Sequence, residues 1–155
     1  MNGAMLSSLE RGVFEAGTKW VTTLQSRPDG ERFYGAGIFF QPFMKNAFNT
    51  TLATKGVWPP PGHTTLSALA IVITQPDSMP GHAEENARHL RDCVEQVNEA
   101  AKKSGIQVLN NYPNYLLAGS PPEEFYDEDT LMLLRAVKRK YDPEDLFNKG
   151  IHVGV

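Results

Sequence analysis

The sequence predicts an α+β domain in which helices cover one face of a small, mostly antiparallel sheet. Segments with helical periodicity alternate with short apolar or aromatic runs along the chain. This alternation is typical of helices packed on a sheet. The chain has 155 residues and no low-complexity linker, and a domain of this length buries roughly two thirds of its unfolded surface. We therefore expect residues 1–155 to form a single domain.

The first half of the chain is predicted to contain two helices and two strands. Residues 5–26 form the first predicted helix, because apolar residues and one glycine recur at spacings of three and four. An aromatic strand is expected at residues 33–40, a short helix at residues 42–55 and a rigid, proline-rich loop at residues 57–62. The run at residues 66–73 is apolar on both faces, which predicts a central strand. The stripe of the first helix consists of Leu6, Leu9, Val13, Gly17, Trp20 and Leu24.

The second half begins with the clearest helix, at residues 83–103. Acidic residues stand at its start and lysines at its end, which suits the helix dipole. A short strand is expected at residues 106–109. A final helix is expected to start from a cap at Asp127, Asp129 or Thr130 and to end near residue 141. The predicted inward face of that helix consists of Leu133, Leu134, Val137 and Tyr141.

Composition and charge argue against several classes of function. The net charge is −3 and no basic stripe is present, so we expect no nucleic-acid partner. The longest apolar run, at residues 66–73, is too short for a membrane span. Neither a signal peptide nor a pair of cysteines is visible, because Cys93 is the single cysteine. These features predict a cytoplasmic protein without membrane attachment.

The histidines do not predict a metal site. His82 and His89 are seven residues apart and can share one side of a helix. However, no carboxylate and third ligand stand at a spacing that is typical of zinc, and Cys93 has no second cysteine beside it. We therefore expect surface roles for these histidines and no bound metal.

A cluster of tyrosines and asparagines is the best candidate for chemistry. Two tyrosines and three asparagines fall within six positions after the predicted short strand. Tyrosine can stack on a planar ligand and offers a phenol for proton transfer, and asparagine both donates and accepts hydrogen bonds. The alternative is a plain turn, because asparagine and proline are turn formers, and composition alone favours it. The cluster consists of Asn110, Asn111, Tyr112, Asn114 and Tyr115.

Two motifs give the chain a family resemblance. One is the Asn111-Tyr112 pair, and the other is Lys-Arg-Lys-Tyr-Asp-Pro-Glu-Asp-Leu-Phe at residues 138–147. Together with the helix at residues 83–103, they resemble the C-terminal part of berberine-bridge-enzyme-like FAD-linked oxidases, which belong to the vanillyl-alcohol-oxidase group. The resemblance is best over residues 66–147 and extends more weakly over residues 33–61.

The resemblance implies the substrate domain of such an oxidase, in which an antiparallel sheet lies over the flavin with helices behind it. The family's FAD-binding domain has no counterpart in this chain. FAD is therefore implied by resemblance only, with Asn111 and Tyr112 as cofactor contacts, and we expect that this chain alone does not bind it. The implied partners are a separate FAD-binding subunit or a second copy of the chain, together with a small-molecule substrate.

The resemblance also suggests roles for individual residues. Leu109 stands where the family usually has a further tyrosine, and the strand at residues 66–73 carries no ionisable side chain that could act as a base. Tyr112 and Tyr34 are therefore the candidate catalytic residues, although an unperturbed phenol with a pKa near 10 is a poor base at neutral pH. The candidate substrate-binding residues are Tyr115, Asn114, Gln75, Phe39 and Trp58.

Three functions remain open from the sequence. The first is part of an FAD-linked oxidoreductase of specialised metabolism that binds a small apolar or aromatic substrate. The second is a cofactor-free cyclase or small-molecule-binding protein that is derived from such an oxidase. The third is a non-catalytic interaction module.

Overall fold

The computed structural model of the chain describes residues 1–33, 35–42, 67–72 and 82–154, with the backbone alone for 67–72. The proline-rich loop predicted at residues 57–62 lies outside these residues. So does the short helix predicted at residues 42–55, apart from Pro42, which belongs to a strand.

The described strands form a four-stranded antiparallel sheet in the order β2-β3-β1-β4. This confirms the α+β class and the antiparallel sheet. Strand β3 pairs with β2 on one side and β1 on the other, so the apolar run forms a central strand as predicted. The strands are β1 (Asn2–Leu6), β2 (Gly37–Pro42), β3 (Ser67–Val72) and β4 (Val108–Leu109).

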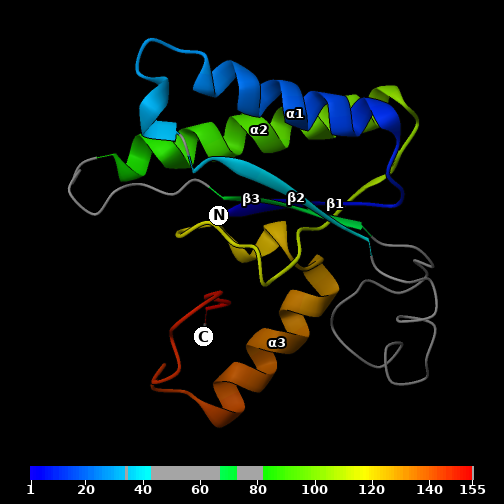
Figure 1. Ribbon diagram of the computed structural model, residues 1–155. Helices are drawn as coiled ribbons and strands as arrows, with labels where there is room; N and C mark the ends of the chain where they lie inside the picture. Colours follow the sequence, from blue (N-terminus) through cyan, green and yellow to red (C-terminus); the bar gives the residue numbers. More distant parts are fainter. Residues whose placement is uncertain (34, 43–66, 73–81, 155) are drawn as a thin grey trace.

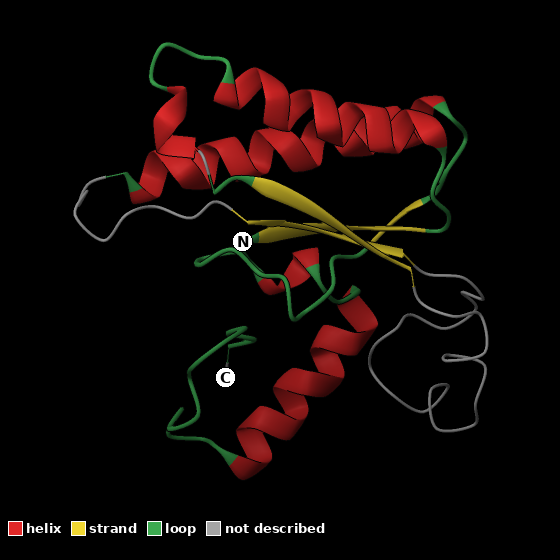
Figure 2. Ribbon diagram, in the orientation of Figure 1, coloured by secondary structure: helices red, strands yellow, loops and turns green. Residues whose placement is uncertain are grey.

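Helices α1 (Arg11–Gln25) and α2 (Ala83–Lys103) lie side by side on one face of the sheet, as Figures 1 and 2 show. The bounds of α2 agree with the prediction. The main apolar core lies between these helices and the sheet. Its members include Ala4, Leu6, Val13, Trp20, Leu24, Phe33, Leu90, Cys93, Val97 and Ala101.

The start of the chain corrects the sequence prediction, because residues 2–6 are a strand and the helix begins only at Arg11. All five residues of β1 are buried, since the strand pairs on both edges and is covered on both faces. In a short run that is buried on both faces, apolar and polar residues do not alternate. Its sequence pattern therefore does not distinguish a strand from a buried helix. Leu6 therefore belongs to β1 and not to the helical stripe, whereas Val13, Gly17, Trp20 and Leu24 are buried on α1 as expected.

The aromatic strand also begins later than predicted. Phe33 ends the 3₁₀ helix η1 (Gly30–Phe33), and β2 starts at Gly37. Ile38 and Phe40 of β2 pack toward α1, where a Cβ on Gly17 would lie 2.8 Å from Ile38 Cδ1. The glycine therefore allows α1 to approach β2 closely. Phe39 and Gln41 alternate with these residues and so face the other side of the sheet.

The opposite face of the sheet is partly covered by the 3₁₀ helix η4 (Pro122–Glu124) and by the start of α3 (Glu128–Tyr141) (Figure 1). The Asp127 side chain caps α3 by accepting a hydrogen bond from Thr130 N at 2.7 Å, which confirms one of the predicted caps. A second set of buried side chains lies outside the main core: Met5, Leu109, Phe125 and Leu131.

The predicted inward face of α3 is wrong for three of its four residues, and Leu134 alone of the four is partly buried. Leu131 is the buried residue of this helix and is only 2% exposed. Leu133, Val137 and Tyr141 are all more than half exposed. The helix carries apolar residues on two sides, and it is the side around Leu131 that turns toward the domain.

Candidate functional site

Two of the tyrosines predicted as site residues, Tyr112 and Tyr115, lie together in a turn after β4. The backbone N–H of Tyr115 donates to the carbonyl oxygen of Tyr112 at 2.9 Å, which closes a β-turn. The two rings meet edge to face, with their centroids 5.1 Å apart. Asn114 Nδ2 donates to the Tyr112 hydroxyl at 2.8 Å. The turn interpretation is therefore correct for the backbone, and this turn brings three of the candidate side chains together.

Strand β2 supplies a residue that the sequence did not indicate. The Tyr115 hydroxyl donates to Gln41 Oε1, across 74 positions of the chain. Gln41 lies two residues beyond Phe39 on the same face of β2, and Phe39 is 62% exposed. The candidate site is therefore the turn at residues 112–115 together with the outer face of β2.

Asn111 is held by a different neighbour. Its backbone N–H donates to the carbonyl oxygen of Glu124 at 2.7 Å, and its Nδ2 donates to Glu124 Oε2 at 3.4 Å. These bonds fix Asn111 against η4. Of the other predicted site residues, Tyr34, Trp58 and Gln75 lie outside the described residues, and their roles stay predictions.

The motif at residues 138–147 connects the end of α3 to the segment that follows it, through hydrogen bonds and ion pairs. The ammonium of Lys138 contacts the carboxylates of Asp142 and Asp145 and donates to the carbonyl oxygen of Phe147 at 2.8 Å. Asp142 in turn accepts from the backbone N–H groups of Leu146 and Phe147, at 2.7 and 3.0 Å. The Lys138 hydrogen bond is the main cause that holds the pKa of Asp142 below its usual range. The motif therefore has a structural role in this chain, and it leaves Leu146 and Phe147 exposed.

His82, the residue before α2, and His89 within it lie around the carboxylate of Glu85, which Arg32 already neutralises. Glu85 Oε2 accepts from Arg32 Nη2 at 2.5 Å and lies 3.1 Å from His82 Nδ1. His89 Nε2 lies 3.7 Å from the other oxygen of Glu85. Arg32 Nη2 also lies 2.6 Å from His82 Nδ1. Within the described residues, no group of three potential metal ligands is found.

We expect Glu85 to stabilise the fold above about pH 4.5. The hydrogen bond from Arg32, and then that with His82, lowers the pKa of Glu85 from 4.5 to about 2. Because the folded-state pKa is depressed, this contribution is present above the unfolded-state value and is lost as the pH falls toward 2. Glu85→Gln should flatten the acid dependence of stability in that window, as measured by urea unfolding at a series of pH values. Glu84→Gln, on the neighbouring residue, should keep the wild-type slope, and an unchanged slope in Glu85→Gln would contradict the prediction.

Comparisons with family models, with curated proteins and with solved structures find no significant match to this chain. None of the helices in the described residues combines the length and apolar character that crossing a bilayer requires.

Proposed function

We propose that the chain is the substrate-binding and C-terminal part of an FAD-linked oxidoreductase of specialised metabolism, and that it works beside a separate FAD-binding domain or subunit. The motifs at residues 111–112 and 138–147 support this family relationship. One structural observation supports the need for a partner. Large apolar side chains of α3 and of the segment after it are exposed. These residues are Leu133, Val137, Tyr141, Leu146 and Phe147, which we term the α3 surface.

The α3 surface has the arrangement of a contact site. Leu133, Val137 and Tyr141 are spaced at i, i+4 and i+8, so they form one stripe along the helix. Hydrogen bonds to Lys138 and Asp142 hold the segment with Leu146 and Phe147 beside the C-terminal end of α3. Contiguous exposed apolar side chains of this number mark interaction sites in soluble proteins. A partner that covers them gains free energy from removing apolar area from water.

The candidate site offers one side of a substrate cavity. Phe39 lies on the sheet face opposite α1 and α2 by strand alternation, and the Tyr115 hydroxyl contacts Gln41 on that same face, so the rings at residues 112 and 115 add aromatic area there. Such surfaces suit a small apolar or aromatic substrate. The hydrogen bonds from Asn114 to Tyr112, and from Tyr115 to Gln41, orient the phenols.

The predicted cofactor contacts fit FAD only in part. Tyr112 lies in the aromatic turn, where its ring can stack on a planar group. The side chain of Asn111 is bonded to Glu124 and is less available. FAD, held mainly by the partner, would supply the oxidising chemistry, and this chain would bind and orient the substrate.

Co-expression with an FAD-domain polypeptide from the same source tests the proposal. We expect a stable heteromeric complex that carries the absorption bands of flavin, measured by size-exclusion chromatography with a spectrum of the eluted peak. A chain that stays colourless and associates with no such polypeptide would overturn the proposal.

A cofactor-free cyclase or small-molecule-binding protein is the second candidate. The observation that favours it is that the hydrogen bonds joining Tyr112, Asn114, Tyr115 and Gln41 form within this one chain. A positioned set of phenols and amides can hold a reactive ligand in one orientation, which lowers a barrier without a redox cofactor. Such a protein would act as a monomer or homodimer and would bind its ligand in the absence of flavin. A chain that associates with a partner but binds no ligand would instead indicate the interaction module.

Tyr112→Phe should weaken ligand binding or turnover by about three- to tenfold, the usual value of one neutral hydrogen bond. The ring and its edge-to-face contact with Tyr115 remain, so the change isolates the hydroxyl. The dissociation constant is measured by titrating the protein with an aromatic ligand that it binds and following the fluorescence. Tyr141→Phe on α3 is the matched control and should bind as the wild type does. Equal binding by Tyr112→Phe would remove the phenol from the proposed site.

A further inference from the structure

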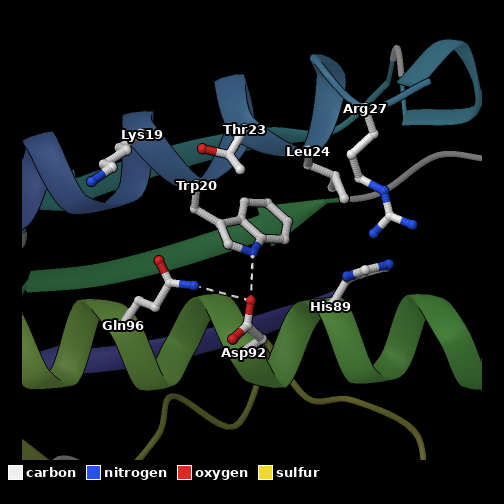
Figure 3. A pocket seen from close by; sticks show the side chains of 8 residues that line it. All are labelled: Lys19, Trp20, Thr23, Leu24, Arg27, His89, Asp92 and Gln96. Carbon is white, nitrogen blue, oxygen red and sulfur yellow. Dashed lines mark hydrogen bonds between the residues drawn. The ribbon is translucent and has the colours of Figure 1, made fainter. Parts of the chain in front are cut away.

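A small groove between α1 and α2 lies on the other side of the sheet from the candidate site. It has a volume of about 290 Å³, near the lower end of small-molecule sites, which span roughly 300–1,000 Å³. Figure 3 shows that its side chains come from both helices and from Arg27, just beyond the end of α1. The lining consists of Lys19, Trp20, Thr23, Leu24, Arg27, His89, Asp92 and Gln96.

Asp92 is a fixed negative group in this groove. Trp20 Nε1 donates to Asp92 Oδ2 at 3.3 Å, and Gln96 Nε2 donates to the same oxygen at 3.0 Å (Figure 3). Asp92 Oδ1 accepts no hydrogen bond from the described residues. The carboxylate is therefore held in place by α1 and α2 while one oxygen keeps its capacity for a ligand donor.

Arg27 and Lys19 are the positive groups on the opposite wall, and Arg27 is the one at the end of α1. Its guanidinium offers the donors that a carboxylate needs. Its Nε donates to Asp29 at 3.0 Å, which anchors the guanidinium at the end of α1. In Figure 3 the guanidinium points from α1 toward His89 on α2, while Asp92 lies further along α2. A guanidinium has five N–H donors, so the bond to Asp29 leaves others that suit a carboxylate. The indole of Trp20, which is almost fully buried, forms an apolar wall between the two charges.

We infer that this groove binds a small zwitterion of the size of an amino acid, with its ammonium group on Asp92 and its carboxylate on Arg27. The carboxylate of Asp92 and the guanidinium of Arg27 match the two ends of such a ligand, and the lining residues Leu24 and Trp20 supply the apolar part of the groove for its side chain. The groove is open to solvent and the ligand is small, so the dissociation constant should be on the order of 1 mM. This site is independent of the proposed oxidoreductase function.

The test uses valine and two matched compounds that each lack one charge. Isobutylamine lacks the carboxylate of valine, and isovalerate lacks its ammonium group. Binding to the full chain is followed by the NMR signal of the Trp20 indole N–H, which is assigned by comparison with Trp58→Phe. We expect valine to shift this signal with a midpoint in the millimolar range, and both single-charge compounds to bind at least tenfold more weakly.

Two variants connect the response to the two charges. Asp92→Asn and Arg27→Gln should each weaken valine binding at least tenfold, whereas Glu95→Gln, on α2 but outside the lining of the groove, should bind valine as the wild type does. Circular dichroism checks that each variant is folded. If one of the two variants is not folded, the valine affinity of the other is compared with that of the wild type. The inference is overturned if valine gives no shift at about 50 mM, if isovalerate or isobutylamine binds equally well, or if a folded Asp92→Asn or Arg27→Gln variant keeps wild-type affinity.

Discussion

Gly30→Ala should lower the free energy of unfolding by about 3 kcal/mol, the upper range for forcing extra atoms into a packed site. A Cβ at this position would lie 1.9 Å from the backbone carbonyl oxygen of Gln25, so the backbone itself must move. Gly30 begins η1, which carries Phe33 into the core and Arg32 to Glu85. A shift of the turn therefore loosens both contacts at once. Urea unfolding followed by circular dichroism measures the change.

Gly12→Ala is the matched control for that variant. It makes the same chemical change within α1, where a Cβ would have only an ordinary contact, 3.6 Å from Ser104 Oγ. Its stability should be unchanged or raised by up to about 1 kcal/mol, because alanine favours a helix. A Gly30→Ala variant with the unfolding midpoint of the wild type would show that the turn accommodates the methyl group.

Val137→Glu should weaken association with the FAD-binding partner by about 100-fold or more. The substitution places a carboxylate in the middle of the α3 surface, where a partner would remove it from water without a compensating group. Val137 is 54% exposed in the chain alone, so the variant should fold as the wild type does. Isothermal titration with the purified partner measures the loss.

Met132→Glu is the matched control for Val137→Glu. Met132 lies on the same helix with 56% exposure, but it is about 140° around the helix from Val137, because successive residues are about 100° apart. Its affinity for the partner should stay near that of the wild type. Equal losses in both variants would indicate a general effect of charge on α3, and no loss in Val137→Glu would exclude the α3 surface as the contact.

The sequence predicts correctly those helix ends that are set by charges, caps and apolar spacing within the helix itself. The ends of α2 follow from its charges and its apolar stripe, and Asp127 was among the expected caps of α3. The sequence does not indicate β1 because the strands that pair with it, β3 and β4, lie far along the chain. The orientation of α3 was also wrong, since periodicity finds an apolar stripe but does not say whether the domain or a partner covers it.

The candidate site was predictable only in its local part. Tyr112, Asn114 and Tyr115 fall within four positions, so their clustering is visible in the sequence. Gln41 is not, because its contact with Tyr115 depends on where β2 lies relative to the turn after β4. The groove between α1 and α2 is hidden for the same reason, since Trp20 and Asp92 are 72 positions apart.

The central position of β1 has a consequence for how the chain folds. This strand is made before β3 and β4, yet its neighbours are residues 67–71 on one edge and residues 108–109 on the other. During synthesis one edge of β1 therefore stays unpaired until residues 67–71 have been made, and the other until residues 108–109 have been made. Contacts of this sequence separation slow folding and leave intermediates open to aggregation. We expect the yield of native protein to depend on translation rate and chaperones more strongly than the final stability would suggest.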